Sequence, residues 1–167
     1  MATGLLVTLT DIRKHTAMNG NIDSDKFVNF VKIAQDLHIQ NLLGTDLIEE
    51  IQSQITTSGA PTGDYLTLTT TYIKPCLIHY AMMEFLPFGA YMISNKGIYK
   101  HSAEASETAD KSEVDMLVEK ERDLAQFYAQ RLIDYLCNNS TLFPEYTTNS
   151  DGDMHPDRDG NFSGWFL

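Results

Sequence analysis

The stretch Tyr72–Tyr99 constrains the fold most, because most of it predicts one long helix with almost no polar face. From Cys76 to Ile93 the ionisable side chains, apart from the thiol and the phenols, are His79 and Glu84. A helix that is apolar all round must be covered on every side. A chain of 167 residues offers few segments for that cover. The helix is therefore either the centre of a small bundle or partly covered by another subunit.

A membrane span is the other structure that such a stretch can form, and the sequence argues against it. The apolar run is only about 18 residues long, at the short end for a span. His79 and Glu84 lie inside it, and Pro87-Phe88-Gly89 interrupts it. A carboxylate at the centre of a lipid bilayer is costly. We therefore expect a buried core helix and no membrane partner.

Composition limits the number of domains, the kinds of partner and the state of the cysteines. A length of 167 residues with 43% hydrophobic and 21% charged residues predicts one globular domain with a proper core. The net charge of −11 argues against binding nucleic acid through its phosphates, which needs a basic surface. Cys76 and Cys137 both lie in apolar helical patterns and are expected to be buried free thiols in a reducing compartment. We see no signal peptide in the first residues.

Helical periodicity predicts five helices, and turn signals separate them. Thr10 is expected to cap a turn at 11–16, and Asp23 or Ser24 the next helix. Asp110-x-x-Glu113 resembles a capping box at the start of the longest helix, a rod of about 40 Å. The expected helices span about 25–39, 45–55, 64–73, 75–93 and 111–138, and the last has an apolar stripe of Val114, Leu117, Val118, Leu124, Phe127, Tyr128, Leu132, Tyr135 and Leu136.

Two of these segments leave alternatives open. The four threonines of 64–73 make a strand a real alternative, although Tyr65, Leu68 and Tyr72 continue a helical period. Pro75 lacks a backbone donor and crowds the preceding turn, so we expect a kink or break near Lys74.

These elements predict an all-α fold, a small helical bundle with a long C-terminal helix. An exposed loop at about 94–109 follows the apolar helix and includes a short extended piece near Gly97–His101. Extended arms are expected at both ends of the chain. The predicted organisation is an N-terminal arm at 1–22, the bundle at 23–139 and an extended C-terminal arm at 140–167.

The last residues differ in character from the linker before them. Pro, Gly, Asp and Asn dominate after Asn139, yet the chain finishes with large apolar side chains. Such a segment docks on its own body or on a partner, and we favour another chain. Removing 150–167 is then expected to abolish assembly and to leave the melting temperature little changed. The apolar residues at this end are Phe162, Trp165, Phe166 and Leu167.

No catalytic or metal-binding motif emerges from the sequence. Counted from Asp151, the acidic segment has His155, Pro156 and Phe162 where a calcium loop needs an oxygen ligand, Gly and Glu. His79 and Glu84 are five positions apart and lie on different faces of a helix, so His79 is expected to be a core or interface histidine. We predict no enzyme, no cofactor and no metal.

Three strings, LLGTDLIEEI, IKPCLIHYAMMEFLPFGAYMISNKGI and KSEVDMLVEKERDLAQFYAQRLIDYLCNNSTLFPEY, together with the terminal Ser163-Gly164-Trp165-Phe166-Leu167, carry a resemblance. Over about residues 8–167 the chain resembles the head-to-tail connector, or head-completion adaptor, proteins of tailed bacteriophages. The shared patterns are hydrophobic and turn patterns rather than a catalytic signature.

The resemblance implies a structural virion protein at the neck between capsid and tail. Its copies would form a homo-oligomeric ring, expected to be twelve-fold, that joins the portal protein to tail or further neck components. DNA would pass through an acidic lumen without specific binding. The alternative is a small non-viral helical module that also forms homo-oligomers. Candidate partner contacts are Asn95, Lys96, Gly97, Ile98, Tyr99, Phe162, Trp165, Phe166 and Leu167.

Overall fold

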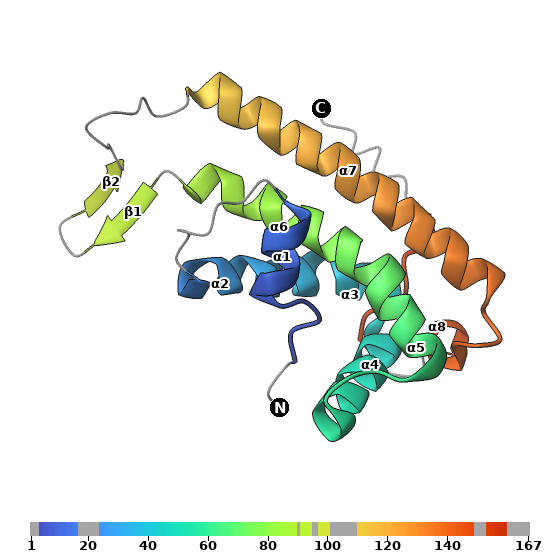
Figure 1. Ribbon diagram of the computed structural model, residues 1–167. Helices are drawn as coiled ribbons and strands as arrows, with labels where there is room; N and C mark the ends of the chain where they lie inside the picture. Colours follow the sequence, from blue (N-terminus) through green and yellow to red (C-terminus); the bar gives the residue numbers. More distant parts are fainter. Residues whose placement is uncertain are drawn as a thin grey trace.

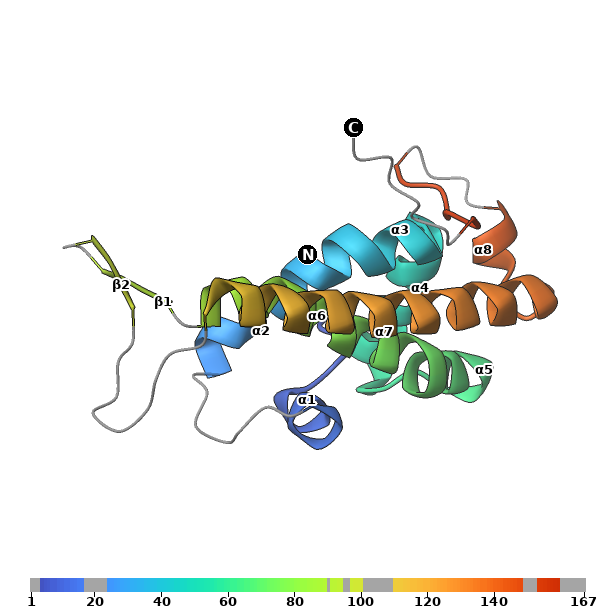
Figure 2. The same cartoon turned by 90° about the horizontal axis from the view of Figure 1, so that it is seen from above.

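The computed structural model describes residues 4–16, 24–89, 91–94, 97–100, 110–148 and 153–159. In these residues the protein is an all-α bundle with a long C-terminal helix and one two-stranded ribbon, as Figures 1 and 2 show, which confirms the predicted fold class. In chain order the elements are α1 Leu9–His15, α2 Ser24–Ala34, the π-helix η1 Gln35–Ile39, α3 Gln40–Leu43, α4 Thr45–Ser58, α5 Gly63–Thr67, the π-helix η2 Leu68–Ile73, α6 Lys74–Gly89, β1 Tyr91–Ser94, β2 Gly97–Lys100, α7 Lys111–Asn138 and α8 Pro144–Thr148.

The apolar helix α6 is the centre of the bundle. It lies between α7 and α2, and α1 crosses it (Figure 1). Small residues of α7 face it, and the Cys76 thiol lies 3.9 Å from the carbonyl oxygen of Ala125. At the C-terminal end of α6 the neighbouring helices cover less of its surface, and Phe88 is 50% exposed. The bundle thus covers most of α6. The buried side chains of α6 are Cys76, Leu77, Ile78, Tyr80, Ala81, Met82 and Phe85.

The segment before α6 is helical, and the break expected near Lys74 is absent. Helix α5 passes into the π-helix η2, which joins α6 directly at Lys74. The Lys74 N–H donates to the carbonyl oxygen of Thr69, five residues earlier. A proline has no N–H and crowds the preceding α turn. The wider π turn accommodates Pro75 within a continuous helix.

Helix α6 is shorter than predicted and ends at Gly89 rather than near Ile93. Pro87 lies in its last turn, where the missing N–H removes one helical hydrogen bond and disfavours continuation of the helix. The chain then forms β1, which pairs antiparallel with β2 in the register Tyr91↔Lys100 and Ser94↔Gly97. The extended piece expected near Gly97–His101 is therefore present as β2. Its partner β1 includes residues that were predicted to be the end of the apolar helix.

Two helix starts show how local hydrogen bonds fix the ends of elements. Asp110 and Glu113 form the predicted capping box of α7, and α7 has the predicted bounds. Helix α1 also begins with a capping box, two residues earlier than expected, because Thr8 rather than Thr10 is the cap. In that box Asp11 Oδ2 accepts hydrogen bonds of 3.1 Å from the Thr8 N–H and 2.8 Å from the Thr8 hydroxyl.

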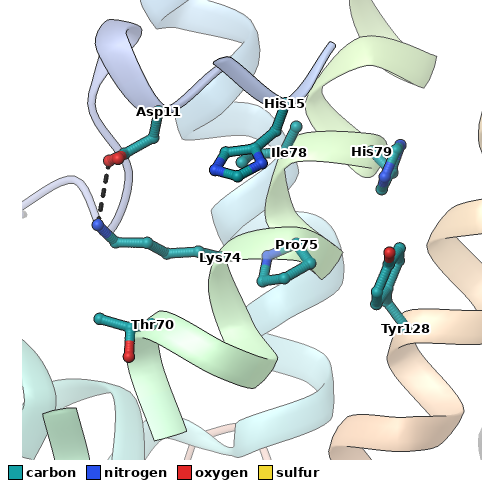
Figure 3. Close-up of a pocket in the computed structure, with 8 residues that line it drawn as sticks. All are labelled: Asp11, His15, Thr70, Lys74, Pro75, Ile78, His79 and Tyr128. Carbon is teal, nitrogen blue, oxygen red and sulfur yellow. Dashed lines mark hydrogen bonds and ion pairs between the residues drawn. The ribbon is translucent and has the colours of Figure 1, made fainter. Parts of the chain in front are cut away.

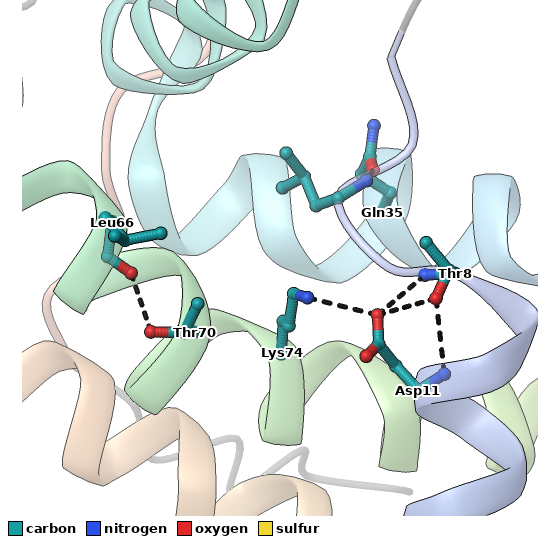
Figure 4. A network of polar contacts seen from close by, with 7 residues as sticks. Thr8, Asp11, Gln35, Leu66, Thr70 and Lys74 are labelled. Atoms are coloured by element: carbon teal, nitrogen blue, oxygen red, sulfur yellow. Dashed lines mark hydrogen bonds and ion pairs between the residues drawn. The ribbon is translucent and has the colours of Figure 1, made fainter. Parts of the chain in front are cut away.

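Polar contacts hold the N-terminal segment on the bundle (Figure 4). The Lys74 ammonium lies 3.0 Å from Asp11 Oδ2. The buried Gln35 side chain accepts a 3.0 Å hydrogen bond from the Leu6 N–H. Burial of the Asp11 carboxylate by itself raises its pKa, but hydrogen bonds from Thr8 and Lys74 outweigh burial and lower the pKa to about 2. This part of the predicted N-terminal arm is thus joined to the core.

The C-terminal segment folds back on its own chain as far as Asp159. Buried Tyr146 anchors α8. The Thr45 N–H donates to the Met154 carbonyl at 3.0 Å, and the Asp157 N–H donates to Asn41 at 2.8 Å. Arg158 bonds the Tyr146 carbonyl at 3.2 Å. Docking on another chain, as favoured from the sequence, does not apply to residues 153–159.

The two cysteines differ in their surroundings. Cys76 is buried, and burial raises the pKa of its thiol. Cys137 is exposed, so the prediction of burial is wrong for it, because it lies on the outer side of α7. Among the described residues, no helix is both long and apolar enough to cross a membrane.

Asp11→Asn should lower the free energy of unfolding at pH 7 by about 1 kcal/mol, as the loss of a capping contact does. An unfolded aspartate has a pKa of about 3.9. Because the folded value is lower, ionised Asp11 stabilises the fold above about pH 4, and this stabilisation is lost as the pH falls towards 2. Urea unfolding at pH 7 and pH 3 measures both effects. Exposed Asp36→Asn is the control, and an unchanged acid dependence in Asp11→Asn would contradict the assignment.

Removal of 153–167 should destabilise the bundle, whereas removal of 160–167 alone should leave its melting temperature unchanged. The first truncation removes hydrogen bonds to Asn41 and Thr45, each worth about 1 kcal/mol. The second leaves them in place. Thermal unfolding of both truncated proteins beside the full chain provides the measurement. Equal melting temperatures for the two truncations would show that residues 153–159 do not stabilise the body.

Candidate subunit-contact surfaces

The contact residues predicted near the ribbon are only partly described. Gly97, Ile98 and Tyr99 form β2, where Ile98 pairs with Ile93 and Tyr99 with Met92. Figures 1 and 2 show the ribbon beyond the C-terminal end of α6, away from the rest of the bundle. This position suits a contact with another protein. The other predicted contacts, Asn95, Lys96, Phe162, Trp165, Phe166 and Leu167, lie outside the described residues.

His79 and Glu84 do not meet, as their spacing predicts, and each has a partner on another helix. His79 Nδ1 lies 2.7 Å from Glu121 Oε2 of α7, and its ring stacks on Tyr128 with centroids 5.3 Å apart. His79 is therefore a half-buried histidine at the packed contact between α6 and α7, as predicted for a core histidine. This imidazole joins α6 to α7.

A second cluster repeats this arrangement on the other side of α6. His38 Nε2 of η1 lies 2.9 Å from Glu84 Oε1, and its ring stacks on Tyr80 with centroids 4.0 Å apart. Each cluster thus contains an imidazole, a carboxylate and a phenol ring contributed by two helices. Together they fix α6 against both neighbours, which is a structural role.

Among the exposed apolar side chains, two groups lie on the helices that flank α6, and Leu66, Phe88 and Leu142 lie elsewhere. The α2–η1 patch consists of Ile33 and Leu37, four positions apart, with Leu37 59% exposed. The α7 patch consists of Met116 and Phe127, 62% and 63% exposed, which are three helical turns apart and therefore lie on one side of α7. The helices that bear the two patches lie on opposite sides of α6 (Figure 1).

The apolar stripe predicted for α7 is wrong at Phe127 and Leu117, which are 63% and 46% exposed. The buried side of α7 is formed by Ala125, Ala129, Leu132, Ile133 and Leu136. Alanine at two of these positions lets α7 approach α6 closely. Because alanine is small, a pattern of large apolar residues does not include these two positions. A 3.6-residue period centred on the buried residues places Phe127 on the opposite, exposed side of α7.

A cavity of about 160 Å³ opens between α1, α6 and α7 (Figure 3). Pro75 and Ile78 supply apolar wall, and the stacked rings of His79 and Tyr128 form one side. Sequence reasoning did not find this cavity, because its walls come from three segments distant in the chain. The full lining is Asp11, His15, Thr70, Lys74, Pro75, Ile78, His79 and Tyr128.

The acidic C-terminal segment is engaged in contacts within the chain. Asp153 Oδ2 accepts hydrogen bonds from Thr45 at 3.1 Å and Gln40 at 3.3 Å. Asp157 accepts a 3.0 Å bond from the Asp159 N–H. Among the described residues no three His, Cys, Asp or Glu side chains are grouped to hold a metal ion. Asp153 therefore serves to attach the segment to α3 and α4.

His79→Ala should lower the free energy of unfolding by about 1–3 kcal/mol, because it leaves the part-buried Glu121 carboxylate without its partner. Glu121→Gln should cost less. The double variant should show a coupling energy above about 0.5 kcal/mol, as contacting residues do. Urea unfolding of the four proteins measures it. Glu119→Gln, exposed on the same helix, is the control. Strict additivity of the two single effects would show that the contact does not stabilise the fold.

Residues 39–155 match a family of unknown function, DUF6712. The match runs from the end of η1 into the docked C-terminal segment, and so includes α6, the ribbon and α7. No curated protein and no solved structure matches the chain. Since the matched residues make up more than half of the 167, this protein belongs to the DUF6712 family.

Proposed function

We propose that this protein is a structural component of a tailed-phage virion. In this proposal its copies form a ring at the head–tail neck, join the portal protein to tail components and continue the DNA channel. The observation that carries the proposal is the pair of exposed apolar patches on two helices that lie on opposite sides of α6. The sequence resemblance to head-to-tail connectors supplies the biological setting.

A ring requires two different contact surfaces on each subunit. In a cyclic assembly of head-to-tail type, one patch of each copy meets a different patch of the next. The α2–η1 patch and the α7 patch meet this requirement, because α6 separates the helices that bear them. Contact would remove from water two side chains that are each about 60% exposed, Leu37 and Phe127.

The charge of the chain suits a DNA channel. A net charge of −11 per copy repels phosphates, and a ring multiplies this charge around its lumen. Duplex DNA would then pass without being held. The ribbon β1–β2, which lies beyond the end of α6, is the surface that we assign to portal or tail partners (Figure 2).

The same patches would also serve a small non-viral homo-oligomer, and the two functions differ in their partners. Light scattering and negative-stain electron microscopy of the purified protein, alone and with a phage portal protein, separate them. Rings that form alone or on the portal support the connector. A dimer or small oligomer that does not bind the portal protein supports the non-viral module and contradicts the connector.

Leu37→Asp and Phe127→Asp should each prevent ring formation, because each places a charge at a contact that buries apolar surface. Both side chains are mostly exposed in the protomer, so circular dichroism and melting temperature should change little. Electron microscopy counts the rings. Ser53→Glu, on the exposed side of α4, is the control and should assemble normally. Normal rings from both Asp variants would show that the patches are not the subunit contacts.

A further inference from the structure

We infer that the cavity between α1, α6 and α7 is a receptor for the Trp165 side chain of a second copy of this chain. This inference rests on the proposed homo-oligomer and names the contact that links one subunit to the next. The observations that lead to it are the size and lining of the cavity, the composition of residues 160–167 and the place where the described C-terminal segment ends.

The cavity has the size and walls for one aromatic ring. Its volume is about 160 Å³, and an apolar cavity of about 150 Å³ accommodates benzene. The ring of Pro75 and the side chain of Ile78 offer apolar contact, and Tyr128 offers the face of a phenol (Figure 3). Aromatic pairs gain stability beyond the area that they bury.

The rim adds polar groups that suit an indole better than a phenyl ring. Tryptophan buries a large apolar surface and also needs an acceptor for its N–H. The Asp11 carboxylate lies at the rim as an acceptor, and the Lys74 ammonium beside it favours the face of an aromatic ring. Among interface residues, tryptophan is also one of the three types that most often dominate binding.

The place where the described chain ends favours a neighbouring copy over the same copy. Figure 2 shows residues 153–159 and α1 on opposite sides of the α6–α7 pair, and the cavity opens on the α1 side. Trp165 follows Asp159 by six positions, a reach of roughly 20 Å. Within one protomer this chain would have to pass round the long helix α7. In a head-to-tail assembly it meets the cavity of the next subunit directly.

Trp165 is the single tryptophan of the chain, so its fluorescence reports the contact in the full-length protein. On raising the protein concentration through the assembly transition, the emission should shift to the blue and iodide should quench it less. Thr70→Phe, which fills the cavity from its exposed rim, should leave the emission red-shifted and weaken self-association at least about 10-fold. Trp165→Ala should weaken association to the same degree.

Thr71→Phe is the matched control, because Thr71 is also exposed but does not line the cavity. Loss of association in Thr70→Phe with retention in Thr71→Phe supports the inference. A blue-shifted emission that does not depend on concentration means docking within one chain and overturns it. Shielding of Trp165 that survives Thr70→Phe, or equal losses in both Thr variants, also overturns it. Rings in which Trp165 stays exposed overturn this contact and leave the proposed connector intact.

Discussion

Burial of the largely apolar surface of α6 is the requirement that positions the other helices. Its surface has no polar face to turn towards water, so α1, α2, η1 and α7 must all lie against it. Close approach on the α7 side depends on Ala125 and Ala129, which leave room for the Cys76 side chain. The two clusters of imidazole, carboxylate and phenol ring then fix the rotation of α6 through directional contacts, which apolar packing alone does not supply.

Much of the fold could be predicted from local signals. The capping box of Asp110 and Glu113 marked the start of α7, and the helical period of residues 64–73 outweighed their threonines. The end of α6 could not be predicted, because Tyr91–Ser94 are apolar enough to continue a helix. Their strand conformation depends on pairing with Gly97–Lys100, a contact that the helical period does not reveal. The attachment of Met154 to Thr45 likewise joins residues more than a hundred positions apart.

The candidate contact surfaces were less predictable than the fold. The sequence indicated that the ribbon and the apolar C-terminal residues meet partners, since both combine a turn-rich neighbourhood with large side chains. It could not indicate the cavity, whose lining depends on the angle at which α1 crosses α6. The period of large apolar residues also failed to separate Phe127 from Tyr128, because the centre of the buried side of α7 includes the small residues Ala125 and Ala129.

The two π-helices bear on how this family can vary in length. A π turn contains one residue more than the α turn it replaces, and each residue of an α-helix turns the chain by about 100°. Relatives that lack one residue within Gln35–Ile39 or Leu68–Ile73 can form an ordinary α turn there. The same sides of the flanking helical segments then still face the core. Single-residue gaps at these two places in a family alignment would therefore mark conserved packing rather than a change of fold.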